Sequence, residues 1–187
     1  MQSLEAINRM LRLTGHQSVN AVDEGDARAA LAIQTLTQVR RDILTTPYQF
    51  NHLRIDLPVD ISGKVPIARK WLSVVLPKNT LAERYDEANN AVFVWDINAD
   101  DWHDSLVQKV IVTYDIVDFP SIPESFAQWI AYEAAQQYFA EHKGGDGSSY
   151  IERRLNQRRQ IAINQNPPIS IDSAIGHTLV KLFHLYR

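Results

Sequence analysis

The stretch "DFPSIPESFAQWIAYEAAQQYFAEH", residues 118–142, decides the fold because helical patterning resumes here after a long β-rich region. Pro123 suits the first turn of a helix, and Glu124 favours the positive end of the helix dipole. The apolar side chains then repeat three and four residues apart, at Phe126, Trp129, Ile130, Ala134 and Tyr138. This spacing predicts an amphipathic helix that begins at Pro123 and ends at the glycine pair 144–145.

Two more helices are predicted before this stretch and one after it. The first covers residues 4–13, and the second covers residues 26–44 and ends before Pro47, since proline disfavours α geometry in the preceding residue. After residues 118–142, "SYIE" at 149–152 is a capping box that starts a helix reaching about residue 163.

Residues 48–117 have the period of strands instead. Apolar residues alternate with polar ones in several short runs, and Asn89-Asn90 suits the positive φ angles of a tight hairpin turn. A slip of the alternation near His52 predicts a β-bulge. The expected fold class is α+β: a helical bundle with an antiparallel β insertion between helices two and three, and a C-terminal arm. The expected domains are 1–47 and 118–163 for the two parts of the bundle, 48–117 for the β insertion and 164–187 for the arm.

Composition bounds the class of protein. The chain has 187 residues, 45% of them hydrophobic, which is enough for a sizeable core. It has no cysteine, which excludes disulfides and thiolate zinc sites. The N-terminal sequence has no signal-peptide core and no apolar run reaches the roughly 20 residues that span a bilayer. These features predict a soluble protein made and kept in a cytosol, without a membrane partner.

Charge is distributed unevenly along the chain. Residues 79–104 carry seven acids against Arg84, and residues 143–187 carry seven bases against three acids. One interpretation is two ordinary solvated surfaces. The other is that opposite charges guide two copies, or two partners, into register. The sequence leaves both interpretations open.

Motifs for chemistry are absent. The segment "NADDWHD", residues 98–104, is rich in oxygen and imidazole groups, but its spacing fits a turn better than a metal loop. There is no G-x-S-x-G, G-x-G-x-x-G or Walker sequence. We therefore expect no enzyme activity, no catalytic residue, no metal site and no cofactor. A carboxylate pair of the glycosidase type is neither shown nor excluded among 22 acidic residues.

Arginines are concentrated in "ERRLNQRR", residues 152–159. Arg154 and Arg158 are four residues apart and therefore share a helix face, with Arg153 and Arg159 beside them. Such a group could bind successive phosphates. A solvated helix face with some local pairing is the simpler interpretation.

The order of these blocks resembles tail tubular protein A, the head-to-tail adaptor of short-tailed bacteriophages. The resemblance lies in the helix–loop–helix that ends in "YQFN" at 48–51, in the hairpin "AVFVWD", and in the helix "DIVDFPSIPESFAQWIAYEAAQQYF". It covers about residues 4–163. Tyr48 stands where the family is expected to have Trp, and the chain after Pro168 has no firm counterpart.

The resemblance implies a structural virion protein that joins portal to tail nozzle. It implies a dodecameric ring through which DNA passes without sequence-specific binding, with portal, nozzle and tail fibres as partners. It also implies assembly in the host cytoplasm and a final location in the virion tail. Two alternatives remain at this point: a virion-associated glycan hydrolase and a small cellular binding module.

The ring that the resemblance implies needs residues at an interface between subunits. Phe126 and Trp129 lie on the core stripe of their helix, whereas Tyr132 and Phe139 lie off it and are candidates for a subunit interface. The remaining candidates are the helix-four arginines Arg153, Arg154, Arg158 and Arg159, and the apolar tail residues Leu179, Phe183 and Tyr186. The tail is expected to dock on another chain, with folding back on its own bundle as the alternative.

Overall fold

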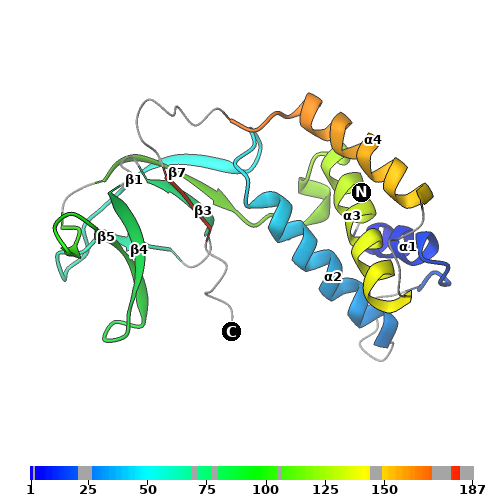
Figure 1. The fold of residues 1–187 in the computed structure, drawn as a ribbon, viewed down its shortest axis with the longest axis horizontal. Coiled ribbons are helices and arrows are strands. Elements are labelled where there is room, and N and C mark those ends of the chain that lie inside the picture. Colours follow the sequence, from blue (N-terminus) through cyan, green and yellow to red (C-terminus); the bar gives the residue numbers. More distant parts are fainter. Residues whose placement is uncertain are drawn as a thin grey trace. The chain divides into compact units, whose positions relative to one another are not determined.

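The fold is described from a computed structural model. It describes residues 1, 3–20, 27–68, 71–76, 80–104, 107–143, 149–169 and 178–181. The chain forms two compact units, each built from two separate parts of the sequence (Figure 1). The first unit is Met1–Ile43 with Ile116–Pro167, and the second is Leu44–Asp115 with Pro168–Arg187.

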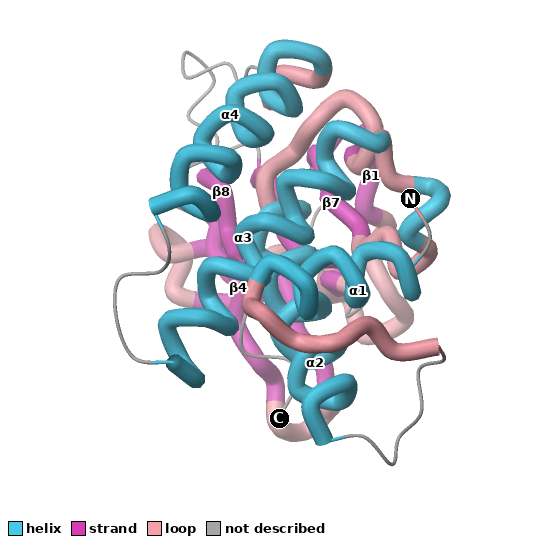
Figure 2. The backbone as a smooth tube through the Cα atoms, turned by 90° about the vertical axis from the view of Figure 1, so that its right-hand side faces the viewer, coloured by secondary structure: helices cyan, strands magenta, loops and turns pink. Residues whose placement is uncertain are grey.

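The first unit is helical. Its helices are α1 (Ser3–Leu13), α2 (Ala27–Leu44, whose last residue belongs to the second unit), α3 (Glu124–Lys143) and α4 (Ser149–Gln165), and a 3-10 turn, η1 (Phe119–Ser121), precedes α3. Figure 2 shows α3 between α1 and α4, and it contacts both of them. The helix that the sequence singled out is therefore the central helix of this unit.

The central position of α3 explains its composition. Phe126, Trp129, Ile130 and Tyr138 are buried along the stripe that periodicity predicts. Ala134 of the same stripe is fully buried, and so are three further alanines of this helix, Ala127, Ala131 and Ala135. Because alanine has only a methyl group, neighbouring helices can approach α3 closely. The aromatic and alanine content of this helix is thus accounted for by packing on more than one side.

The outer helices bury one face each. On α1 the buried residues are Ala6, Ile7, Met10 and Leu11, and on α2 they are Ala29, Ala32, Leu36, Val39 and Ile43. Ile33, which lies at helical spacing from the buried residues Ala29 and Leu36, is only half-buried. Ala29 and Ala32, which both precede Ile33 in the sequence, are fully buried.

The second unit contains two antiparallel sheets. One has the strand order β1-β7-β3-β8 and the other β2-β5-β4, with β6 also paired to β5. The strands are β1 (His52–Leu57), β2 (Pro66–Ile67), β3 (Trp71–Leu76), β4 (Leu81–Asp86), β5 (Ala91–Asp96), β6 (Asp101–Trp102), β7 (Val107–Tyr114) and β8 (Thr178–Lys181). This confirms the α+β class, with antiparallel strands between helices two and three.

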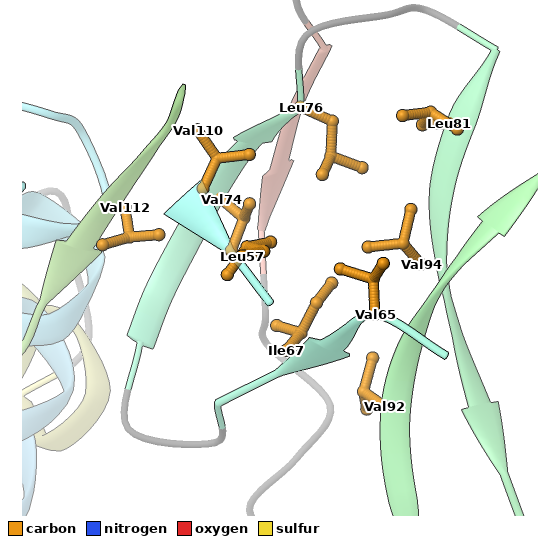
Figure 3. Close-up of a cluster of buried hydrophobic side chains, with 10 residues drawn as sticks. All are labelled: Leu57, Val65, Ile67, Val74, Leu76, Leu81, Val92, Val94, Val110 and Val112. Atoms are coloured by element: carbon orange, nitrogen blue, oxygen red, sulfur yellow. The ribbon is translucent and has the colours of Figure 1, made fainter. Parts of the chain in front are cut away.

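The core of this unit lies between the two sheets. Figure 3 shows aliphatic side chains from both sheets pointing toward one another. Val74, Val110 and Val112 come from the first sheet, and Val92 and Val94 come from the second. Leu57, Val65, Ile67, Leu76 and Leu81 complete the cluster. Successive side chains of a strand point to opposite faces. The strand residues that alternate with the cluster residues therefore point to the outer face of each sheet.

Two details of the strand prediction were tested. The hairpin of β4 and β5 is present, and Asn90 has the positive φ angle, 48°, that its turn requires. The bulge is not near His52, where the slip of the pattern placed it. His52 instead begins β1, and the register shifts between Ile55 and Leu57. Tyr48 and Phe50 precede the strand, so their alternation was not a strand signal.

Part of the predicted arm forms a strand. Thr178–Lys181 pair with Leu76–Ser73 of β3 in antiparallel register. Ile169 also donates its amide to the carbonyl of Pro47 at 2.9 Å. These residues therefore associate with the β unit of their own chain, which neither interpretation of the tail anticipated. The prediction that the arm docks on another chain stays a prediction.

Candidate assembly surfaces

Helix α4 presents most of its circumference to the surroundings. Its buried residues are Ile151, Leu155 and Ala162, which lie on one side of the helix and leave a narrow apolar stripe. Arg153, Arg154 and Arg159 are exposed, and Arg158 is half-buried. This helix therefore buries little and carries a dense positive charge.

The four arginines do not form one patch. At roughly 100° per residue, Arg154 and Arg158 fall on one side of the buried stripe, and Arg153 lies opposite the stripe, about 100° from Arg154. Arg159 falls on the other side, with its guanidinium carbon 5.7 Å from the ring centre of Trp129. We call the first three residues the α4 cationic face. Arg159 instead packs its charge over an aromatic ring of α3.

The α4 cationic face has few partners of its own. Arg154 lies 5.7 Å from the ring centre of Tyr150 and donates to the side-chain oxygen of Gln157 at 3.2 Å. Within the described ranges, no ion pair joins any of these arginines to a carboxylate. The Nε of Arg158 is buried without a hydrogen-bond partner. The face is thus a cationic surface whose charge is not neutralised by the described part of the chain.

On the outer face of the second sheet, Lys64 and Arg84 each contact side chains of the same unit. Lys64 lies 2.5 Å from a carboxylate oxygen of Asp86, and 4.6 Å from the ring centre of Trp102. The hydrogen bond from Lys64 is the main reason that the pKa of Asp86 is lowered to about 2. Arg84 lies over the ring of Trp95, 4.1 Å from its centre, and the Trp95 ring meets the Trp102 ring edge-on at 4.9 Å. These contacts hold the side chains together locally.

Acidic residues gather instead at the turn between β5 and β6. The Asp96 carboxylate accepts the amides of Asn98, at 2.9 Å, and Ala99, at 3.3 Å, so it shapes the turn. Asp100 has a φ of 52°, which Asp tolerates better than most residues. We define the acidic tip as Asp96, Asp100, Asp101 and Asp104, of which the last three are exposed. Among the described residues, no group of three or more His, Cys, Asp or Glu side chains is arranged to hold a metal ion.

The other predicted site residues have varied surroundings. Tyr132 is 9% exposed and belongs to the core of the first unit, so it offers little surface to a partner. Phe139 is half-buried. Leu179 is part of strand β8, whereas Phe183 and Tyr186 lie outside the described residues. Their roles at an interface stay predictions.

Sequence reasoning gave no role to Asn51, although it is fully buried and bonded. Its side-chain amide donates to the carbonyls of Leu44, at 2.6 Å, and Thr46, at 3.2 Å. Its side-chain oxygen accepts the amide of Tyr48 at 2.7 Å. Carbonyls in the last turn of a helix lack helical partners, so this one side chain satisfies the end of α2 and orders the segment that follows. The one sequence feature that pointed to Asn51 is its place in "YQFN", one of the segments in which the chain resembles tail tubular protein A.

Most of the helical unit and the strands β1 to β7 fall within a match to known proteins. Residues 4–170 match the family described as Tube: Tail tubular protein. The chain belongs to the tail tubular protein family. It is also 25% identical over 154 residues to "Tail tubular protein A" of Klebsiella phage KP34, covering 79% of this chain and 77% of that protein.

Family membership fixes the broad role of the chain. As a tail tubular protein it is a structural component of the phage tail and is located in the virion. No helix in the described part of this tail tubular protein is long and apolar enough to cross a membrane. The match includes Asn51 and the α4 arginines, and it ends before β8.

Proposed function

We propose that this tail tubular protein is the head-to-tail adaptor: a dodecameric ring between the portal protein and the tail nozzle. DNA passes through its lumen without recognition of sequence, and the protein catalyses no reaction. The observation that carries this proposal is the family match over residues 4–170, which takes in most of both compact units. The relative in Klebsiella phage KP34 carries the name tail tubular protein A.

Two physical features support a ring. Each subunit of a cyclic ring needs two different surfaces, since its front binds the back of the next subunit. The chain carries a cationic surface on α4 and an acidic one at the β5–β6 turn, on different units. Surfaces of opposite charge suit front-to-back pairing better than pairing of like with like.

The proposal is tested by withholding the protein from particle assembly. A phage in which the gene is disrupted is grown with or without the chain supplied from a plasmid, and its particles are viewed by negative-stain electron microscopy. We expect separate DNA-filled heads and tail parts without the chain, and joined particles with it. Joined particles in its absence would contradict the adaptor role. So would a labelled chain located at the far end of the tail.

A further inference from the structure

The α4 cationic face is left without a partner of opposite charge in the described part of the chain. Arg153 and Arg154 are exposed, and Arg158, on the same side of the helix as Arg154, has a buried Nε without a hydrogen-bond partner. Arginine is well suited to carboxylates, which it binds with two parallel hydrogen bonds. A surface of this kind favours an acidic partner.

The same chain carries an acidic surface of matching character. The acidic tip has four aspartates within nine residues, and His103 is the other ionisable residue of that segment. Within the region 79–104 the other acids are placed differently: Asp86 is paired with Lys64, Glu83 is half-buried, and Glu87 lies at the opposite end of β5. The exposed negative charge of the region is therefore concentrated at the tip.

From these two surfaces we infer that the acidic tip of one subunit binds the α4 cationic face of a second copy of this chain. The inference rests on the proposed ring, because a contact between two different surfaces is what a front-to-back ring requires. Charge complementarity also selects this pairing over contact between two tips or two α4 faces, in which like charges would meet. Duplex DNA is the competing occupant of an arginine face.

Disulfide trapping tests the contact directly, and the absence of native cysteine leaves no background. Gln157 is exposed beside Arg153 and Arg154, and Asn98 is exposed at the tip. Full-length Gln157→Cys and Asn98→Cys proteins are mixed in equal amounts under mild oxidation, and covalent heterodimer is measured. The control replaces Asn98→Cys with Glu87→Cys, which is also exposed on a turn of β5 but at its other end.

We expect roughly ten times more heterodimer from the Asn98→Cys pair than from the control pair, and loss of this excess in about 0.5 M salt, where charges are screened. The substitutions Arg153→Glu and Arg154→Glu remove the excess when they are placed on the Gln157→Cys partner. Placed on the Asn98→Cys partner they leave it unchanged, because that copy contributes its tip. This asymmetry separates a specific contact from a change in net charge.

Equal yields from the two pairs would overturn the inference. So would an arginine variant that traps normally but binds duplex DNA more weakly, since the face would then serve phosphates. The adaptor role is judged separately, by particle assembly. Specific trapping with normal particles in the absence of the chain would reject the adaptor role and keep the contact.

Discussion

Single residues at structural junctions determine how the elements of this chain are joined. Asn51 is the clearest case, because one buried amide satisfies two carbonyls and one backbone amide between Leu44 and Tyr48. Asn51 also accepts from the amide of Tyr114 through its own backbone carbonyl, at 3.2 Å. The end of α2, the start of β1 and the end of β7 therefore meet at one residue.

Replacing Asn51 with leucine tests this role. Asn51→Leu keeps a similar volume but leaves the carbonyls of Leu44 and Thr46 and the amide of Tyr48 without their partner. We expect the free energy of unfolding to fall by about 3 kcal/mol or more, since each buried unsatisfied group costs about 1–3 kcal/mol. Urea unfolding followed by circular dichroism measures it. Asn156→Leu, at an exposed position of α4, is the control and should change stability little.

Glu83 is the residue most sensitive to pH. It lies on the edge strand β4 opposite Val94, two residues from the core residue Leu81, so it faces the sandwich core. One of its carboxylate oxygens is buried without a hydrogen-bond partner. Burial raises the pKa of Glu83 to about 7 from its ordinary value of 4.5. An inward-facing charge on an edge strand also discourages pairing of that edge with another sheet.

The raised pKa predicts how stability changes with pH. Between pH 4.5 and 7 the folded chain holds more protons on Glu83 than the unfolded chain does, so stability falls as pH rises through this window. Glu83→Gln should remove that slope and stabilise the protein at pH 8 by on the order of 1 kcal/mol, discounted for partial exposure. Melting temperatures from pH 4 to 8 measure it. A slope that persists in Glu83→Gln, or disappears in Glu87→Gln, would reject this assignment.

At the scale of elements, periodicity identified the helices but not their neighbours. The apolar stripe of α3 correctly marks Phe126 and Trp129 as core, yet Tyr132 on the other side of the helix is buried too. One stripe is all that a period of 3.6 reveals, whereas a central helix is covered on more than one side. Arg159 likewise does not belong to the α4 cationic face, because its guanidinium group lies beside Trp129 of α3. Such contacts depend on tertiary packing.

The last strand is a further element that local sequence did not reveal. Short apolar segments are ambiguous, and a strand that pairs with β3 across about a hundred residues gives no local signal. The tail was therefore predicted as an arm. The sequence also did not predict which strands face one another across the two sheets. It did predict the hairpin of β4 and β5, because the residues that favour its turn are local.

Removing the last strand tests its contribution. Deletion of residues 170–187 takes away β8 and leaves the edge of β3 unpaired, so we expect a loss of about 1–3 kcal/mol in stability and some edge-to-edge association. Deletion of residues 182–187, which keeps β8, is the control for shortening the chain. Calorimetry gives the stability, and light scattering gives the association. Equal melting temperatures for the full chain and the longer deletion would show that β8 adds nothing.

At the scale of the whole molecule, the sequence predicted the arrangement because helices and strands are segregated along the chain. Residues 48–117 contain no helical pattern, and in the described ranges the structure places β1 to β7 between α2 and α3. The broad class thus follows from the order of periods alone. The assembly surfaces could not be predicted from the sequence alone. Only the structure shows that Asp86 is paired with Lys64 and that a carboxylate oxygen of Glu83 is buried, so that the exposed acids of this region are those of the acidic tip.

The helical unit is made from two ends of an interrupted sequence, and this has a consequence during translation. Glu124 of α3 follows Leu13 of α1 by 111 positions. At about 5–20 residues per second, the ribosome needs roughly 5–20 seconds to supply the partner of α1. During that time Ile7, Met10 and Leu11 have no α3 to cover them, while β1 to β7 emerge as a continuous segment. We therefore expect β1 to β7 to pair before the helical unit is complete, and β8 to join its sheet last.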